Sequence, residues 1–214
     1  MKAIFVEAIA NPDYVLFDIL ALSKVAHDHK ISLIVNNTFG MGVASNIYRN
    51  ASVHSATKWI GGHEMIISGK TLSLHGERHS PNGFALAKWL DMHPHIAWVL
   101  YPGLESHPLH EMAKRQMQPS HFGRMLSFGI KGDIQTASQF VDNLKLVSNL
   151  PNVGDVKTLV IHPDSTSHSR LTAEEQLKSG VTPDLICVCL PKLIEAINNI
   201  IADFQGTFNV VFDA

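Results

Sequence analysis

The chain has 214 residues, enough for one large domain or two small ones with a real core. Hydrophobic residues make up 45% of the chain and charged residues only 17%. The formal net charge is −2, with no basic block, which argues against nucleic acid as a partner. No apolar run reaches the length that spans a bilayer, and the N-terminal MKAIFVEAIANPD is typical of a strand rather than a signal peptide.

The first part of the chain predicts a strand–helix–strand unit. Residues 2–9 alternate in hydrophobicity and are rich in β formers, and residues 14–30 carry apolar side chains at helical spacing. Residues 31–35 form a short, wholly apolar run, as expected of a strand that is buried on both faces. Strand, helix and strand in this order predict a βαβ unit and therefore a parallel sheet.

Strand and helix patterns alternate through the rest of the chain. A helical pattern over 70–92 is interrupted by Pro81 and Gly83, and Thr172 and Gly180 have the residue types of a helix cap and stop. We expect further strands at 96–103, 124–130, 158–163 and 184–190, and further helices at 108–117, 135–147, 172–180 and 193–205.

One lysine, Lys58, lies among small and hydroxylic residues in VHSATKWIGGH. A lysine in such a setting acts as a base or forms an imine with a carbonyl compound. Imine chemistry with pyridoxal phosphate needs donors for the phosphate, a carboxylate for the pyridine nitrogen and a stacking partner for the ring. Ser55 and Thr57 offer hydroxyl groups beside Lys58, although hydroxyls in this pattern are also typical of a capped turn.

The longer strings NNTFG and VHSATKWIGGH resemble the Cys/Met-metabolism family of pyridoxal phosphate enzymes, the transsulfuration group. The resemblance covers nearly the whole chain, through EAIANPD, WVLYPGLESHPLHEMAK, MLSFGIKG, LTAEEQLKSGVTPDLI and IIADFQ. The segments NLKLVSN and NVGDVKTLVIHP are most similar to those of O-acetylhomoserine sulfhydrylases, also called homocysteine synthases.

This resemblance implies an α/β fold with two parts. Residues 1–69 would be the C-terminal part of a fold-type I large domain that binds pyridoxal phosphate, and residues 70–214 a small α/β domain. The composition changes near Gly69 and Lys70, which agrees with that boundary. Relative to the family, the chain looks truncated upstream and internally deleted after Gly69.

The resemblance also implies roles for individual residues. Lys58 would form the imine with pyridoxal phosphate, and Ser55 and Thr57 would bind its phosphate. Asn11 would lie near the cofactor ring. Thr158 lies where the family's backbone helps to hold the substrate carboxylate.

Two residues depart from the family pattern. Asn36 stands where the family has the aspartate that keeps the pyridine nitrogen protonated, and a neutral amide cannot hold that charge. Cys187 stands where the family has the arginine that clamps the substrate carboxylate, and a cysteine supplies neither the charge nor the bidentate geometry. For Asn36 the residues favour a structural role, as a strand-end amide bonded to a loop.

Two functions therefore stay open. The chain is a sulfur amino-acid enzyme by descent, which would convert O-acetylhomoserine and sulfide to homocysteine and acetate. Alternatively, it is a non-catalytic remnant or a partner subunit of an intact homologue. We expect a small-molecule amino-acid substrate, a cytoplasmic location and self-association, since the family is homo-oligomeric.

The remaining sulfur and imidazole groups suggest no further site. We expect Cys187 and Cys189 to point to opposite faces of a strand and to form no disulfide. The paired histidines of HPH (93–95) and HPLH (107–110) match no closed zinc pattern, so we interpret them as solvated or structural and predict no metal.

Overall fold

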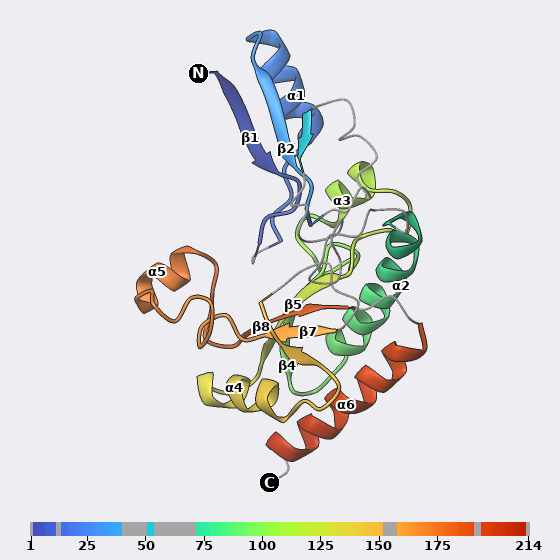
Figure 1. The fold of residues 1–214 in the computed structure, drawn as a ribbon, viewed down its shortest axis with the longest axis vertical. Helices are drawn as coiled ribbons and strands as arrows, with labels where there is room; N and C mark the ends of the chain where they lie inside the picture. Colours follow the sequence, from blue (N-terminus) through green and yellow to red (C-terminus); the bar gives the residue numbers. More distant parts are fainter. Residues whose placement is uncertain are drawn as a thin grey trace.

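The computed structural model describes most of the chain in six stretches: residues 2–11, 14–39, 51–53, 72–151, 158–190 and 194–212. Its helices and strands form two separate sheets with helices packed on them (Figure 1). No helix within these stretches is long and apolar enough to cross a membrane.

The first sheet is parallel, with strand order β1–β2–β3, and lies in the upper part of Figure 1. Its strands are β1 (Ala3–Glu7), β2 (Ser32–Asn36) and β3 (Ala51–Val53). Helix α1 (Ile19–Asp28) connects β1 to β2, which confirms the predicted βαβ unit. The helix begins five residues later than the start of the predicted helical stretch, because the Asp18 side chain caps it by accepting from the Ala21 N–H.

Strand β2 is buried on one face only, so the prediction of burial on both faces is wrong. Leu33 and Val35 are buried against α1, whereas Ile34 is half-buried and Ser32 is exposed. The apolar run had indicated a central strand, but burial of its second face needs a covering layer that the described residues do not provide.

The second sheet has the order β4–β5–β8–β7–β6 and is mostly antiparallel, with β6 and β7 parallel. Four of its strands were predicted, whereas the two-residue β6 was not. The strands are β4 (Ile96–Leu100), β5 (Met125–Ile130), β6 (Ser148–Asn149), β7 (Leu159–Ile161) and β8 (Leu185–Cys189).

Three helices cover one face of this sheet: α2 (Leu72–Asp91), α4 (Ile134–Asn143) and α6 (Ile194–Phe212). Helices α2 and α6 lie side by side in Figure 1. Fully buried phenylalanines join the layers, with Phe204 of α6 packed edge-to-face against Phe140 of α4 at 5.3 Å between ring centroids.

Helix α2 runs without a break through Pro81 and Gly83, so the predicted interruption is wrong. The Ser80 carbonyl accepts a hydrogen bond from the Tyr101 hydroxyl at 3.3 Å, and the Ser80 hydroxyl accepts one from the Gly123 N–H at 3.0 Å. A side chain at position 83 would lie 2.7 Å from the Gly123 carbonyl oxygen. Gly83 therefore allows α2 to pack closely on the chain before β5, and these tertiary contacts hold a helix that Pro81 weakens locally.

Two shorter helices complete the fold. Helix α3 (His110–Gln116) contacts the first unit through Gln116, whose side-chain oxygen accepts from the Ile19 N–H at 3.3 Å. Helix α5 (Ala173–Lys178) lies on an arm that extends from the second sheet (Figure 1).

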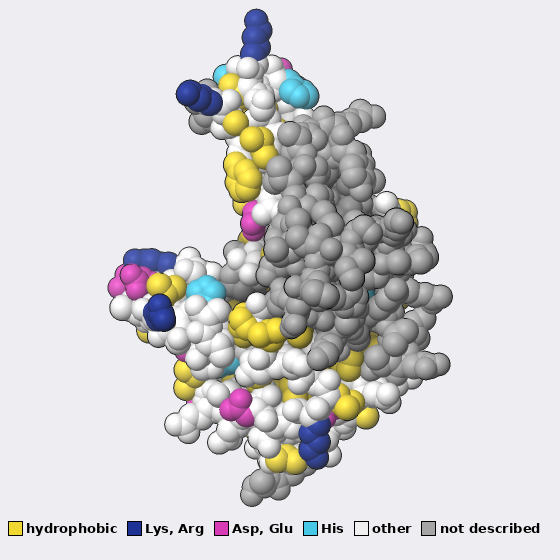
Figure 2. Space-filling view, viewed as in Figure 1, with side chains coloured by type: hydrophobic (Ala, Val, Ile, Leu, Met, Phe, Trp, Pro, Cys, Tyr) yellow, Lys and Arg dark blue, Asp and Glu magenta, His cyan; other side chains and the backbone are white. Residues whose placement is uncertain are grey.

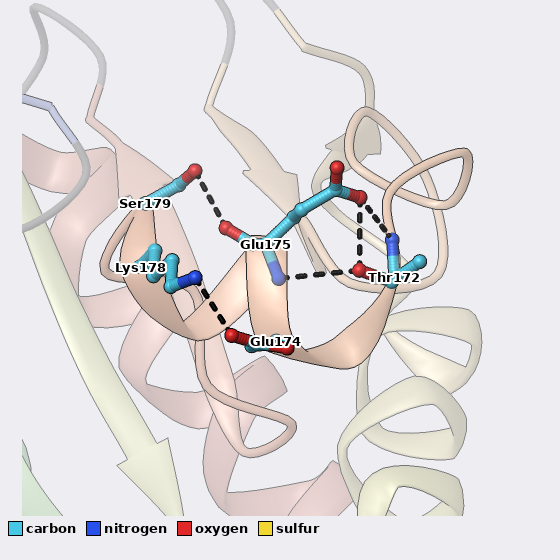
Figure 3. A network of polar contacts seen from close by, with 5 residues as sticks. All are labelled: Thr172, Glu174, Glu175, Lys178 and Ser179. Carbon is cyan, nitrogen blue, oxygen red and sulfur yellow. Dashed lines mark hydrogen bonds and ion pairs between the residues drawn. The ribbon is translucent and has the colours of Figure 1, made fainter.

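Local sequence accounts for both ends of α5 (Figure 3). Thr172 and Glu175 form a reciprocal capping box, as the predicted cap required. Glu174 and Lys178 make an ion pair at 2.7 Å on the exposed face. Gly180 follows the helix with a φ of 77°, the left-handed conformation that ends many helices.

Candidate functional site

The carboxyl ends of β1 and β2 bring Glu7 and Asn36 together, at the edge where open parallel sheets bind ligands. The Asn36 amide nitrogen donates to the Glu7 carboxylate at 3.2 Å. Its amide oxygen accepts from the N–H and hydroxyl of Thr38, at 3.1 and 2.6 Å. Both ends of the Asn36 amide are thus bonded to protein groups, which gives it the structural role of a strand-end amide.

The predicted cofactor residues around Lys58 lie outside the described residues. Strand β3 ends at Val53, whose register partner is Asn36. Ser55, Thr57 and Lys58 follow Val53 in the sequence. Their approach strand therefore ends at the same sheet edge as Asn36.

Asn11 follows β1 and is exposed in a turn. The chain then returns along itself, since the Ala10 N–H donates to the Val15 carbonyl at 2.9 Å and Ile9 pairs with Leu16. This return places Tyr14 against the second sheet, where it joins a core cluster with Leu159 and Cys189.

Cys187, the second departure from the family pattern, lies in the middle of β8 opposite Ser127 of β5. Its thiol shares a hydrogen bond with the Ser127 hydroxyl, with Sγ 3.2 Å from Oγ. The side chain is 7% exposed, and burial raises the pKa of the thiol to about 11, which Ser127 offsets in part. Position 187 is therefore neutral at physiological pH and cannot bind a carboxylate by charge.

The two cysteines are free, as predicted, but the reason given for it is wrong. Residues two apart in a strand share a face, and Cys187 and Cys189 both lie close enough to Tyr14 to influence its hydroxyl.

Tyr14 is a member of this site that the sequence did not single out. Its side chain is 2% exposed and its φ of 54° lies in the left-handed region, which costs about 1–2 kcal/mol for a bulky residue. Its hydroxyl makes no hydrogen bond of good geometry to any described residue, although Ser127 lies nearby. Burial and then the Cys187 thiol raise the pKa of Tyr14 well above its ordinary value. Only tertiary packing shows this arrangement, because Tyr14 lies in the connection between β1 and α1, whereas Ser127 lies in β5 of the second sheet.

Thr158, the predicted substrate contact, is buried just before β7. Its carbonyl accepts from the Ser148 N–H at 3.1 Å, so that carbonyl is used by the sheet. Cys187 pairs with Ile161, three residues further along β7, which offsets Thr158 from Cys187 by about 10 Å along the strand.

Neither histidine pair contributes to a metal centre among the described residues, where no group of three potential ligands occurs. Instead, His107 accepts from the Leu109 N–H at 3.1 Å, and His110 bonds the Pro102 carbonyl at 2.9 Å. Burial, and then His110, lower the pKa of His107, which keeps its ring neutral as the acceptor that this turn requires.

Comparison with known proteins identifies the family of the chain. The family model described as Cys/Met metabolism PLP-dependent enzyme matches residues 1–70 and 69–209. The chain therefore belongs to that family, whose cofactor is pyridoxal phosphate.

Several relatives are described as sulfhydrylases or homocysteine synthases, and others as L-methionine gamma-lyases. The chain is 37% identical over 286 residues to Sulfhydrylase FUB7 of Gibberella moniliformis, with 100% of the chain and 65% of the relative covered. It is 38% identical over 294 residues to the homocysteine/cysteine synthase of Saccharomyces cerevisiae, covering 99% of the chain and 66% of the relative. The chain thus spans slightly less than two thirds of these relatives.

A solved structure shares the fold. It is described as an O-acetylhomoserine (thiol)-lyase from Campylobacter jejuni and contains an N'-pyridoxyl-lysine-5'-monophosphate. The TM-score is 0.87 at 25% identity, with 98% of this chain and 66% of that chain covered. The two-part α/β fold is therefore that of fold-type I enzymes.

The alignments also show an internal difference. The alignment to Sulfhydrylase FUB7 runs over 286 residues, more than the 214 of this chain, so the relative contains sequence that this chain lacks. The two family matches meet at residues 69 and 70, where the internal deletion was predicted.

If Asn36 faces the cofactor ring, as the resemblance implies, position 36 does not fit pyridoxal phosphate with a protonated ring nitrogen. That nitrogen needs a carboxylate, and position 36 holds an amide whose nitrogen donates to Glu7 and whose oxygen accepts from Thr38. An amide can donate to an unprotonated pyridine nitrogen, but it cannot hold the pyridinium charge.

Proposed function

We propose that this chain is a pyridoxal phosphate-binding protein of the O-acetylhomoserine sulfhydrylase class that no longer sustains homocysteine formation. Its family and its sulfhydrylase relatives support the class. The proposed loss of activity is supported mainly by Cys187, a buried, neutral thiol at the position where the resemblance implies the carboxylate-binding arginine.

In this proposal Lys58 holds the cofactor, and Ser55 and Thr57 hold its phosphate. Asn11 lies near the cofactor ring, and Asn36 faces the ring nitrogen with a neutral group. Pyridoxal phosphate, when bound, would supply an electron sink for carbanion chemistry, which a neutral group at position 36 would weaken.

The proposal also covers the remaining properties of the chain. The large-domain part ends near residue 69, and the small domain comprises 70–214. Thr158 lies beside the place of the substrate carboxylate. The class acts on a small amino-acid substrate, replacing acetate with sulfide, and the chain resides in the cytoplasm and self-associates.

Two missing charges are enough to lower the rate severely. A charge-assisted hydrogen bond contributes roughly 1.5–3 kcal/mol, which corresponds to about one to two powers of ten in rate when it is lost from the transition state. Losing the contacts at positions 36 and 187 together therefore lowers the rate by about two to four powers of ten.

Cofactor binding and turnover are tested separately. The purified chain is incubated with pyridoxal phosphate, reduced with borohydride and mapped by peptide analysis, with Lys58→Ala as the control. We expect the pyridoxyl label on Lys58 and its loss in the control. A label on Lys70 instead, or no label at all, contradicts the binding proposal.

Turnover is measured as homocysteine formed from O-acetylhomoserine and sulfide. We expect none above background from the unmodified chain, and none from Asn36→Asp combined with Cys187→Arg. The carboxylate introduced at position 36 would face Glu7, and the arginine introduced at position 187 would meet Ser127 and Tyr14 in a closed core. Clear turnover by the unmodified chain would show an active sulfhydrylase and overturn the proposed loss of activity. Recovery in the double variant alone would show that these two charges suffice and that the surrounding packing is no obstacle.

A further inference from the structure

The turn formed by His93, Pro94 and His95 lies between the end of α2 and the start of β4, against α6. The His93 ring stacks on Phe208 with 4.2 Å between centroids, and the His95 ring stacks on Phe212 at 4.1 Å. Both phenylalanines belong to α6. The turn therefore holds the C-terminal half of that helix.

A directional chain of hydrogen bonds joins the same turn to α6. The His95 backbone N–H donates to His93 Nδ1 at 3.4 Å, so Nδ1 carries no proton. His93 Nε2 then carries the proton and donates to the Gln205 side-chain oxygen at 3.3 Å. Gln205 in turn donates to the Asn209 side-chain oxygen at 3.0 Å, which fixes the direction of its amide.

Protonation of His93 at Nδ1 breaks the first of these hydrogen bonds, the one from the His95 N–H. A proton on Nδ1 replaces an acceptor with a donor that faces the His95 N–H, so two N–H groups oppose each other. Because the His93 side chain is only 8% exposed, water has little access to compensate.

The charged groups around the turn add to this effect. The His95 ring lies 5.5 Å from the His93 ring, so two protonated rings would repel each other. Lys131, after β5, donates its ammonium to the Pro94 carbonyl at 2.7 Å and adds a further positive charge.

Groups on the two packed helices compensate for these charges only in part. On α2, Asp91 is exposed, and the helix C-terminus itself favours a cation. On α6, Asp203 bonds the backbone N–H groups of Lys145 and Leu146 instead of the turn. Burial first, and then His95, lower the pKa of His93, although Gln205 acts in the opposite direction.

We propose that the His93–Pro94–His95 turn is a proton-sensitive clamp that holds the C-terminal half of α6 on the domain at neutral pH and loosens it in acid. The neutral ring stabilises the docked helix above the ordinary histidine pKa of about 6.5. That stability is lost as the pH falls toward the lowered pKa of the folded protein.

The test is hydrogen exchange of the α6 amides in the full chain at about pH 7.5 and about pH 5, corrected for intrinsic exchange rates. We expect the corrected rates to rise about 2- to 12-fold in acid, the factor for losing one neutral hydrogen bond. The variant His93→Phe keeps an aromatic ring against Phe208, but that ring cannot be protonated. We therefore expect the corrected exchange rates of the α6 amides in this variant to be the same at both pH values. His27→Gln, which removes an exposed histidine of α1, behaves like the wild type. The proposal is overturned if acid raises α6 exchange equally in the wild type and in His93→Phe, or if it does not raise α6 exchange in the wild type.

A second measurement needs no variant at this turn. Trp89 contacts the His93 ring at 4.8 Å between centroids and reports on its charge through fluorescence. We expect the His93 ring signals in NMR, the Trp89 emission and the α6 exchange to change over one pH range, below the ordinary histidine pKa of about 6.5. Titration of His93 with no accompanying change in α6 exchange contradicts the proposal.

Discussion

The two sheets of this molecule are built from similar strand–helix patterns, but they bury very different amounts of apolar surface. The second sheet carries a large core with fully buried phenylalanines from several elements. Among the described residues, the first sheet has a small core beneath α1, and Phe5 of β1 is 62% exposed. Figure 2 shows exposed hydrophobic side chains on the upper part of the molecule, where β1 and α1 lie. Because the free energy of unfolding follows buried area, the second sheet contributes most of the stability.

The largest effect is expected in the aromatic core of the second sheet. Phe204→Ala removes a fully buried ring that packs on Phe140 and Phe128, and should lower the free energy of unfolding by about 3–5 kcal/mol. Leu20→Ala on α1, where the side chain is 51% exposed, should change it by less than about 0.5 kcal/mol. Urea unfolding measures both, and similar losses would refute the unequal division of stability.

The next effect concerns the carboxyl edge of the first sheet. Asn36→Asp replaces a donor to Glu7 with a second carboxylate, and should cost about 1–3 kcal/mol at neutral pH. The repulsion requires both carboxyl groups to be ionised, so the loss is absent below pH about 4 and develops as the pH rises above that value. Adding Glu7→Gln should restore stability, because the new amide donates to the carboxylate introduced at position 36. A destabilisation that Glu7→Gln leaves unchanged would mean that this contact is not its cause.

Two buried tyrosines at the junction of the sheets should respond in opposite directions. Tyr101 donates its hydroxyl to the Gly123 carbonyl at 2.7 Å, so Tyr101→Phe should lower the free energy of unfolding by about 1 kcal/mol. The Tyr14 hydroxyl has no such partner among the described residues, so Tyr14→Phe should raise it by about 1 kcal/mol. Thermal and urea unfolding of the two variants provide the comparison. Equal losses would show that the Tyr14 hydroxyl is bonded after all.

Substitution in β1 is expected to have the smallest effect on the free energy of unfolding but a measurable effect on self-association. This strand pairs with β2 alone among the described strands, and an edge with an exposed Phe5 favours self-association. Phe5→Lys should change stability by less than about 0.5 kcal/mol and shift sedimentation toward the monomer. Val210→Lys, at a 57% exposed position of α6, should leave association unchanged. An unmodified chain that sediments as a monomer would contradict the prediction.

The sequence by itself determined the family and those elements whose signals are local. The strings around Lys58 and the DLI run before Cys187 identify the class, because they keep the residue types of its site. The two ends of α5 were predictable because each depends on a local signal. The Thr172 side chain caps the start, and the left-handed φ of Gly180 ends the helix. Helix α6 was predicted to end at residue 205 and instead continues to Phe212, where the His95 ring stacks on it.

Only the tertiary structure decided the features that depend on residues far apart in the chain. Pro81 stays inside α2 because Tyr101 and the chain at Gly123 bond Ser80 beside it. Tyr14 reaches Cys187 because a reversing loop carries it from the first sheet to the second. The neutrality of Cys187 follows from its residue type, but its inertness comes from burial beside Ser127, its partner across two antiparallel strands. Hydrophobic periodicity in the sequence indicates which face of a helix or strand is apolar. Which residues pack against that face is decided by the tertiary structure of the whole chain.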